Sequence, residues 1–73
     1  MGLAVRPRML IKFLESHGFV FARSRGTSHH IYKKGGRTVS IPVHNRDLTV
    51  GILSSILLQA DLDRKAFEKW LGR

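Results

Sequence analysis

Apolar residues in the first part of the chain change from helical to strand-like spacing. Over residues 7–17, Leu10, Phe13 and Leu14 recur at the intervals of an amphipathic helix. Gly18 follows this stretch and suits the position just after a helix end. The pattern therefore predicts a first helix that turns one face to a core and ends near Gly18.

Three short segments rich in aromatic and β-branched residues come next, separated by turn-forming residues. They are residues 19–23, 29–34 and 38–44. Gly35 and Gly36 accept positive φ angles and predict a tight hairpin between the second and third segments. Apolar and polar residues alternate along the third segment. Its Pro42 lacks an N–H group, so this strand is expected at an edge of the sheet.

Two more helices are expected after the strands. Thr49 suits the N-cap of the second helix, in which four apolar residues share one face. These residues are Leu53, Ile56, Leu57 and Ala60. Asp63 suits the N-cap of a short third helix, in which Phe67, Trp70 and Leu71 recur at helical spacing. The predicted order of elements is α-β-β-β-α followed by an extra helix.

This order predicts a single α+β domain over residues 1–73, with a three-stranded antiparallel sheet, helices on one face and the other face open. A chain of 73 residues has room for one modest core. It contains no cysteine, which excludes disulfides and thiolate metal sites. No apolar run approaches the roughly 20 residues that span a bilayer, and the apolar stretch at the N-terminus is too short for a signal peptide. We therefore expect a soluble, cytoplasmic protein with no membrane association.

The net charge of +8 is concentrated in one part of the chain. Residues 1–46 contain nine Lys or Arg and a single acid, Glu15, whereas residues 47–73 contain four charges of each sign. A one-sided positive field attracts polyanions, and nucleic acid is the usual one. The charge distribution therefore favours nucleic-acid binding over a surface that is charged only for solubility.

Three short motifs carry a resemblance to a known family. They are His17-Gly18-Phe19, Gly26 to His29, and Pro42 to His44. In this order and spacing they resemble the HicA family of bacterial toxins over about residues 8–62, which leaves residues 63–73 as an extra C-terminal helix. The resemblance implies a fold similar to double-stranded-RNA-binding domains. It also implies that the chain is the toxin of a type II toxin–antitoxin system, cleaves messenger RNA, and has a HicB-type antitoxin as partner.

Two positions depart from the family pattern. Thr27 makes the turn before the histidines one residue longer than in many relatives. Asp61 stands where relatives often end the second helix with glycine. Because aspartate adopts the left-handed conformation less easily than glycine, we expect this helix end to be built differently.

Strand geometry separates the two adjacent histidines. Neighbouring side chains on a strand point to opposite faces, so His29 shares a face with Ile31, and His30 shares one with Tyr32. If Tyr32 packs under the helices, His29 faces the open side; if Ile31 does, the assignment reverses. We favour Tyr32 inward because large aromatic side chains dominate burial in small cores. The resemblance also implies that the essential histidine is the one directly after the turn, His29.

RNA cleavage of this kind needs no metal or cofactor, because the internal 2′-hydroxyl of RNA is the nucleophile. Histidine suits transfer of the hydroxyl proton near neutral pH, so the predicted catalytic residue is His29. Cations beside it would hold the RNA backbone and offset charge on the phosphate. The predicted RNA-binding residues are Arg23, Arg25, Ser28, Lys33, Lys34 and Arg37. His44, at the end of the third strand, is a candidate supporting residue.

The residues argue against a metal site, and none is expected. Zinc needs three or four converging ligands, whereas His29 and His30 project to opposite faces and only Glu15 and Asp47 are acids near them in sequence. His17, at a helix end, suits a capping role better than a catalytic one.

Two other functions, RNA binding without cleavage and DNA binding, are compared with RNA cleavage. The alternative to a ribonuclease is a non-enzymatic RNA-binding module, because the same kind of fold recognises RNA by shape and backbone contacts. DNA binding is disfavoured, because no helix is basic enough to sit in a major groove. The resemblance implies messenger RNA and a HicB-type antitoxin as partners. The positive charge adds the expectation that the antitoxin has an acidic surface that covers the open face of the sheet. A homodimer is left open.

Overall fold

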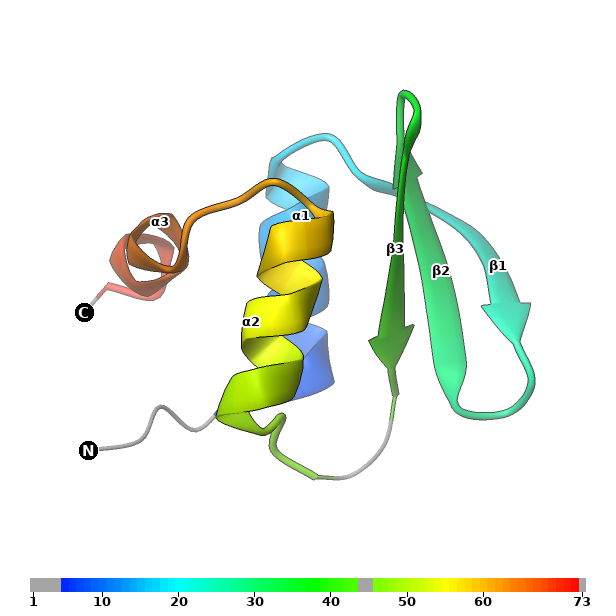
Figure 1. Cartoon of the computed structure of the whole chain (residues 1–73), viewed down its shortest axis with the longest axis horizontal. Helices are drawn as coiled ribbons and strands as arrows, with labels where there is room; N and C mark the ends of the chain where they lie inside the picture. Colours follow the sequence, from blue (N-terminus) through cyan, green and yellow to red (C-terminus); the bar gives the residue numbers. More distant parts are fainter. Residues whose placement is uncertain (1–4, 44–45, 73) are drawn as a thin grey trace.

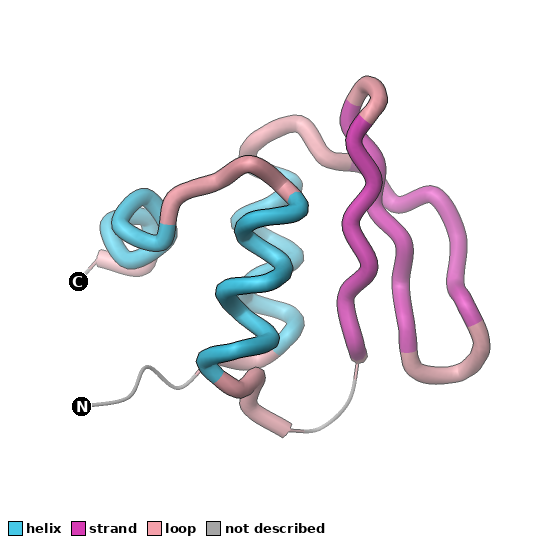
Figure 2. The backbone as a smooth tube through the Cα atoms, viewed as in Figure 1, coloured by secondary structure: helices cyan, strands magenta, loops and turns pink. Residues whose placement is uncertain are grey.

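The elements follow one another in the predicted order (Figures 1 and 2). The computed structural model describes residues 5–43 and 46–72. Its elements are α1 (Pro7–Ser16), β1 (Val20–Arg25), β2 (His29–Lys34), β3 (Arg37–Pro42), α2 (Val50–Gln59) and α3 (Arg64–Trp70). The strands form one antiparallel sheet in the order β1-β2-β3. Helices α1 and α2 lie on the same side of this sheet, and α3 lies beyond them, away from the strands (Figure 1). The predicted α+β class is confirmed.

β1 is longer than the sequence pattern indicates. The pattern ends the first strand at Arg23, whereas β1 continues to Arg25. The added residues pair with the start of β2, and these ladder hydrogen bonds outweigh the turn preference of a serine. The pairing register also shifts between Phe21 and Arg23, which is the mark of a β-bulge. The turn between β1 and β2 is therefore short, spanning residues 26–28.

Pro42 ends β3 with its ring nitrogen on the free edge of the sheet. The N–H of Val43 donates to the carbonyl of Ser28 over 2.7 Å, so it points toward β2. Because successive residues of a strand direct their N–H groups to opposite sides, the nitrogen of Pro42 points outward. Its missing N–H costs no ladder hydrogen bond, and the predicted edge position is confirmed. His44, at the end of the predicted third strand, lies outside the described residues.

The hydrophobic core lies between the helices and the inner faces of β2 and β3. Its members are Val5, Leu10, Phe13, Leu14, Phe19, Tyr32, Val39, Ile41, Leu48, Leu53, Ile56, Leu57, Ala60 and Phe67. All the apolar residues predicted for one face of the second helix are among them. β1 contributes none, because every residue of this strand is exposed. β1 therefore extends the sheet beyond the layer of helices.

The ends of α1 and α2 use the same left-handed backbone conformation. The φ angle is 92° at Gly18 and 57° at Asp61. After α2, the N–H of Leu62 donates to the carbonyl of Leu57 over 2.9 Å, which is the longer-range bond of a Schellman motif. The expectation that Asp61 changes this helix end is therefore wrong. Short polar side chains tolerate the left-handed region better than other non-glycine residues, and the Asp61 carboxylate pairs with Arg37 at 3.6 Å.

α3 closes the core at the end of the molecule away from the sheet. The predicted N-caps of α2 and α3, Thr49 and Asp63, each accept a backbone N–H, over 3.2 and 3.0 Å. Phe67 is fully buried, and its ring centroid lies 5.0 Å from that of Phe13. Trp70 packs 5.6 Å from Phe13 but keeps 41% of its surface exposed. The predicted apolar face of the third helix is thus present, with Phe67 inside the core and Trp70 at its rim.

Candidate active site

The strand register assigns each side chain of the sheet to the helix-covered face or to the open face, because directly paired residues share a face. Tyr32 belongs to the core under the helices, and His30, two residues earlier on β2, lies on the same face. His29 and Ile31 consequently lie on the open face. The interpretation with Tyr32 inward is confirmed. Ile31 is also buried, but it is not part of the core packed against the helices.

His29 lies on the open face at the start of β2, the middle strand. Its partners in register are Arg25 of β1 and Pro42 of β3. The residue is exposed, and its Nδ1 atom lies 3.3 Å from the hydroxyl oxygen of Ser28. Because Nδ1 is engaged with Ser28, Nε2 is the ring nitrogen that is left to meet a ligand.

Three of the predicted RNA-binding cations share the open face with His29. Arg25 is paired with His29 directly, Arg23 is paired with Ile31, and Lys33 lies two residues further along β2. At about 3.3 Å per residue, His29 and Lys33 are separated by roughly 13 Å along the strand. The open face therefore carries a line of positive charge with His29 at one end.

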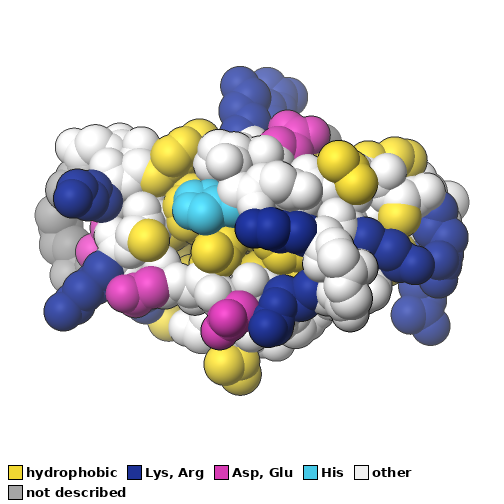
Figure 3. All heavy atoms as spheres, turned by 90° about the horizontal axis from the view of Figure 1, so that it is seen from above, with side chains coloured by type: hydrophobic (Ala, Val, Ile, Leu, Met, Phe, Trp, Pro, Cys, Tyr) yellow, Lys and Arg dark blue, Asp and Glu magenta, His cyan; other side chains and the backbone are white. Residues whose placement is uncertain are grey.

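The charge of this line is not neutralised by neighbouring acids. In Figure 3, Lys and Arg side chains gather at the end of the molecule that the strands form, and acidic side chains lie among the cations toward the helical end. Within the described residues the ion pairs are Arg6–Asp47, Arg37–Asp61 and Arg64–Glu68. None of them involves Arg23, Arg25 or Lys33, so these side chains can bind an external anion.

Lys34 and Arg37 lie on the opposite face of the β2–β3 hairpin. The Lys34 ammonium lies 5.9 Å from the centroid of the Phe19 ring, within the range of a cation–π contact. Arg37 donates to the Gln59 carbonyl over 3.2 Å and pairs with Asp61 at 3.6 Å. The structure therefore does not bring these two predicted residues to the open face. The alternation of side chains along the strands, counted from His29 and His30, was the sequence signal that could have assigned Lys34 and Arg37 to the face opposite His29.

The other histidines that the structure describes have different surroundings. His30 is half-buried, and its ring centroid lies 5.2 Å from that of Phe21. His17 follows α1, and its Nδ1 lies 3.0 Å from the carbonyl oxygen of Phe13. That carbonyl already accepts a hydrogen bond from the Ser16 hydroxyl over 2.6 Å. A proton on Nδ1 of His17 would add a second hydrogen bond at the helix end, which agrees with the predicted capping role.

Residues 5–43 and 46–72 contain neither a metal-binding cluster nor a membrane-spanning helix. No group of three or more His, Cys, Asp or Glu side chains there could hold a metal ion. In the same part of the chain, no helix combines the length and the apolar character needed to cross a bilayer.

The fold and the site together define a small α+β domain with one basic, open sheet face that presents a histidine. A model of the family described as the HicA toxin of bacterial toxin–antitoxin systems matches residues 7–62. The chain therefore belongs to the HicA toxin family and is the toxin of a toxin–antitoxin system, in which family membership implies a HicB-type antitoxin as partner. The resemblance predicted from the motifs is confirmed, and α3 lies beyond the matched segment. A comparison with curated proteins found no match.

The pKa of the Tyr32 phenol gives a test of the inward position of this side chain. Burial raises its pKa above the ordinary value, and the Glu15 carboxylate raises the pKa further. The protonated phenol thus stabilises the fold fully below the ordinary pKa of about 10, and this contribution is lost as pH rises from there through the folded-state pKa. Because the chain has one tyrosine, phenolate absorbance is expected to appear at higher pH in the folded protein than in denaturant. Glu15→Gln should lower the midpoint only part of the way, since burial is the larger cause. Equal midpoints in folded and denatured protein would contradict the inward position of Tyr32.

Proposed function

We propose that this toxin is a metal-independent endoribonuclease that cleaves messenger RNA, with His29 as the general base. The observation that carries the proposal is the position of His29, exposed on the open face of the middle strand and paired directly with Arg25. A proton acceptor and a cation thus face the same accessible surface. Membership of the HicA family supports the proposal, because mRNA interferase activity is known for this family in general terms.

In the proposed reaction, Nε2 of His29 takes the proton of an RNA 2′-hydroxyl. The 2′ oxygen forms a bond to the adjacent phosphorus, and the bond from phosphorus to the 5′ oxygen of the next nucleotide breaks. The leaving oxygen takes a proton from solvent, so the products carry a 2′,3′-cyclic phosphate and a 5′-hydroxyl. Arg25 would offset the charge that develops on the phosphate, and Arg23 and Lys33 would hold neighbouring phosphates.

Ser28 fits a positioning role for this chemistry. For Nε2 to accept a proton, the neutral imidazole must carry its own proton on Nδ1. The hydroxyl oxygen of Ser28, 3.3 Å from Nδ1, can accept a hydrogen bond from that N–H. This role is distinct from the RNA contact predicted for Ser28 and keeps the basic nitrogen of His29 directed away from the turn.

The test is cleavage of a messenger RNA by the purified toxin in the presence of EDTA. Cleavage that persists in chelator and leaves 2′,3′-cyclic phosphate and 5′-hydroxyl ends would support the mechanism. Loss of cleavage on chelation, or products with 3′-hydroxyl ends, would overturn it. Salt-sensitive, saturable RNA binding without any cleavage would identify an RNA-binding module instead.

Charge reversal on the open face is expected to weaken RNA binding more than charge reversal on α3. Arg23→Glu, Arg25→Glu or Lys33→Glu should each remove a phosphate contact, so the slope of log affinity against log salt concentration should fall by about one. Lys65→Glu is the matched control, because Lys65 is exposed on α3. Titration with one RNA across a salt series measures both effects. Equal losses from Lys65→Glu and the open-face variants would count against this face as the RNA surface.

The HicB-type antitoxin is expected to silence the toxin by covering His29. An acidic partner surface complements the unpaired cations of the open face. Protection of His29 from chemical modification in the purified complex, together with loss of cleavage, checks this. A complex that contacts α3 and leaves His29 as reactive as in the free toxin would show that inhibition takes another route.

A further inference from the structure

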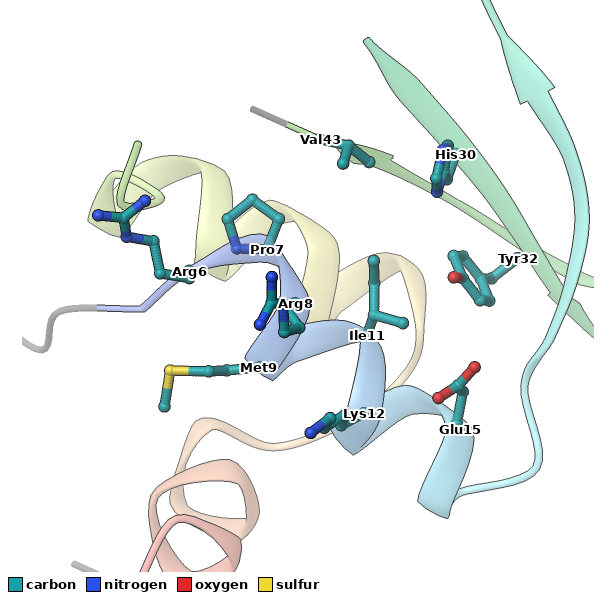
Figure 4. A pocket seen from close by; sticks show the side chains of 10 residues that line it. All are labelled: Arg6, Pro7, Arg8, Met9, Ile11, Lys12, Glu15, His30, Tyr32 and Val43. Carbon is teal, nitrogen blue, oxygen red and sulfur yellow. The ribbon is translucent and has the colours of Figure 1, made fainter. Parts of the chain in front are cut away.

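A groove of about 760 Å³ lies on the helix side of the sheet, on the opposite face from His29. The side chains that matter here are Arg8, Ile11, Lys12 and Glu15 from α1 and His30 and Tyr32 from β2. Figure 4 shows the α1 residues along one side of the groove, with His30 and Tyr32 facing them from the strand. The groove exists because β1 and the adjoining part of β2 extend past the helices, so that this part of the inner sheet face is left uncovered.

The strand side of the groove continues into an aromatic cluster. The ring of Phe21 on β1 meets His30 at a centroid distance of 5.2 Å and Tyr32 at 5.7 Å, edge to face in both cases. Tyr32 is almost fully buried, whereas Phe21 keeps 50% of its surface exposed. An exposed aromatic ring held by two others is a preorganised surface for a flat partner.

The α1 side of the groove supplies positive charge. Arg8 and Lys12 lie one helical turn apart and are exposed. Neither takes part in an ion pair within the described residues, whereas Arg6 at the end of the groove is paired with Asp47 at 3.0 Å. Glu15 is the acidic residue of the lining and lies close enough to Tyr32 to raise the pKa of its phenol. A ligand that fits must combine a flat apolar part with negative charge.

We propose that this groove binds a nucleotide of single-stranded RNA, with its base against Phe21 and His30 and its phosphate near Arg8 and Lys12. The proposal rests on the proposed ribonuclease function, because the bound strand is the substrate. His29 and His30 are adjacent in β2, and their side chains point to opposite faces of the sheet. An RNA strand that passes around the β1–β2 turn can therefore place one nucleotide at His29 and a nearby nucleotide in the groove. Duplex RNA keeps its bases stacked inside the helix and could not enter in this way.

The first test measures RNA binding in a His29→Ala background, which keeps the RNA intact. Fluorescence anisotropy with a short single-stranded RNA is expected to show that Phe21→Ala weakens binding by about tenfold, since stacking on an aromatic side chain contributes roughly 1–3 kcal/mol per base. Lys12→Glu is expected to weaken binding to a similar extent. The matched controls are Leu58→Ala and Lys65→Glu, because both side chains are exposed on other helices. Circular dichroism of every variant checks that the fold is retained.

The second test uses the same RNA with one base at a time replaced by an abasic ribose. At one position, removing the base should weaken RNA binding to the His29→Ala protein about as much as the added Phe21→Ala substitution does. Removing the same base should cause no further loss of affinity in the protein that carries both substitutions. Unchanged RNA affinity in both groove variants, or losses that add fully at every position, would overturn the proposal. Groove variants that keep RNA binding but lose a purified HicB-type antitoxin would identify a protein-docking surface instead. None of these binding results depends on cleavage, so failure of the His29 mechanism would be seen separately.

Discussion

His29→Ala is expected to slow RNA cleavage by at least about a hundredfold, because general acid–base catalysis contributes roughly 10² to 10⁴ in rate. The fold should be unaffected, since His29 is exposed and its hydrogen bond within the described residues is to its neighbour Ser28. RNA binding should be largely retained, because Arg23 and Arg25 remain on the same face. Single-turnover cleavage with saturating protein, alongside an RNA titration, measures the two quantities separately.

His30→Ala is the matched control for this experiment. His30 is half-buried against the Phe21 ring, so its loss should lower the free energy of unfolding by about 1 kcal/mol, the typical value of an aromatic pair. Because His30 also lines the groove proposed to bind an RNA base, its loss should weaken RNA binding, but at saturating RNA the cleavage rate should fall far less than in His29→Ala. Wild-type cleavage by His29→Ala, or loss of cleavage in His30→Ala with an intact fold, would show that the general base has been misassigned.

Phe67→Ala is expected to lower the free energy of unfolding by about 3–5 kcal/mol, the usual cost of truncating a buried phenylalanine. Phe67 is fully buried, and its ring packs against Phe13 of α1. A domain of 73 residues is expected to have a total stability of only about 5–10 kcal/mol. The variant should therefore be partly or wholly unfolded at physiological temperature. Thermal unfolding followed by far-UV circular dichroism gives the measurement, because this signal does not depend on Trp70, the lone tryptophan, which lies beyond residue 62.

Leu58→Ala provides the comparison for Phe67→Ala, because Leu58 is 80% exposed on α2 and should change the stability by less than about 0.5 kcal/mol. A chain shortened after residue 62 separates the segment that matches the family from α3. It should fold no better than Phe67→Ala. If both the shortened chain and Phe67→Ala keep the unfolding free energy of the parent within about 1 kcal/mol, α3 is an accessory to the domain and not part of its core.

The element order and the two faces of the sheet could be predicted because both depend on local periodicity. Helical spacing places Leu10, Phe13 and Leu14 on one side of α1 wherever that helix packs, and all three are buried. Strand alternation separates His29 from His30 regardless of tertiary structure. The remaining choice was whether Ile31 or Tyr32 packs against the helices, and the larger size of the tyrosine ring predicted the correct residue.

Features that depend on contacts between distant segments could not be predicted in this way. Lys34 and Arg37 are near His29 in sequence, but their side chains dock the hairpin onto Phe19 and the end of α2. The groove between α1 and β2 forms only because the sheet is wider than the helix layer. Composition does not indicate that the sheet is wider than the helix layer. The sequence does show two cations, Arg8 and Lys12, one turn apart on the polar side of the first helix. The left-handed Asp61 likewise depends on the Schellman bonds around it.

Both free edges of the sheet are interrupted, and this affects how the chain behaves when no partner covers it. An unbroken edge strand presents a regular row of N–H and C=O groups to which a strand of another molecule can add. The outer edge of β3 ends in Pro42, which has no N–H to offer, and the bulge between Phe21 and Arg23 breaks the spacing along β1. Fibrils grow by the addition of strands to such edges. Here the bulge hinders addition at β1, and Pro42 limits addition at β3 to residues 37–41. The backbone geometry of the two edges and the net charge of +8 therefore both disfavour the addition of strands from other molecules to this sheet.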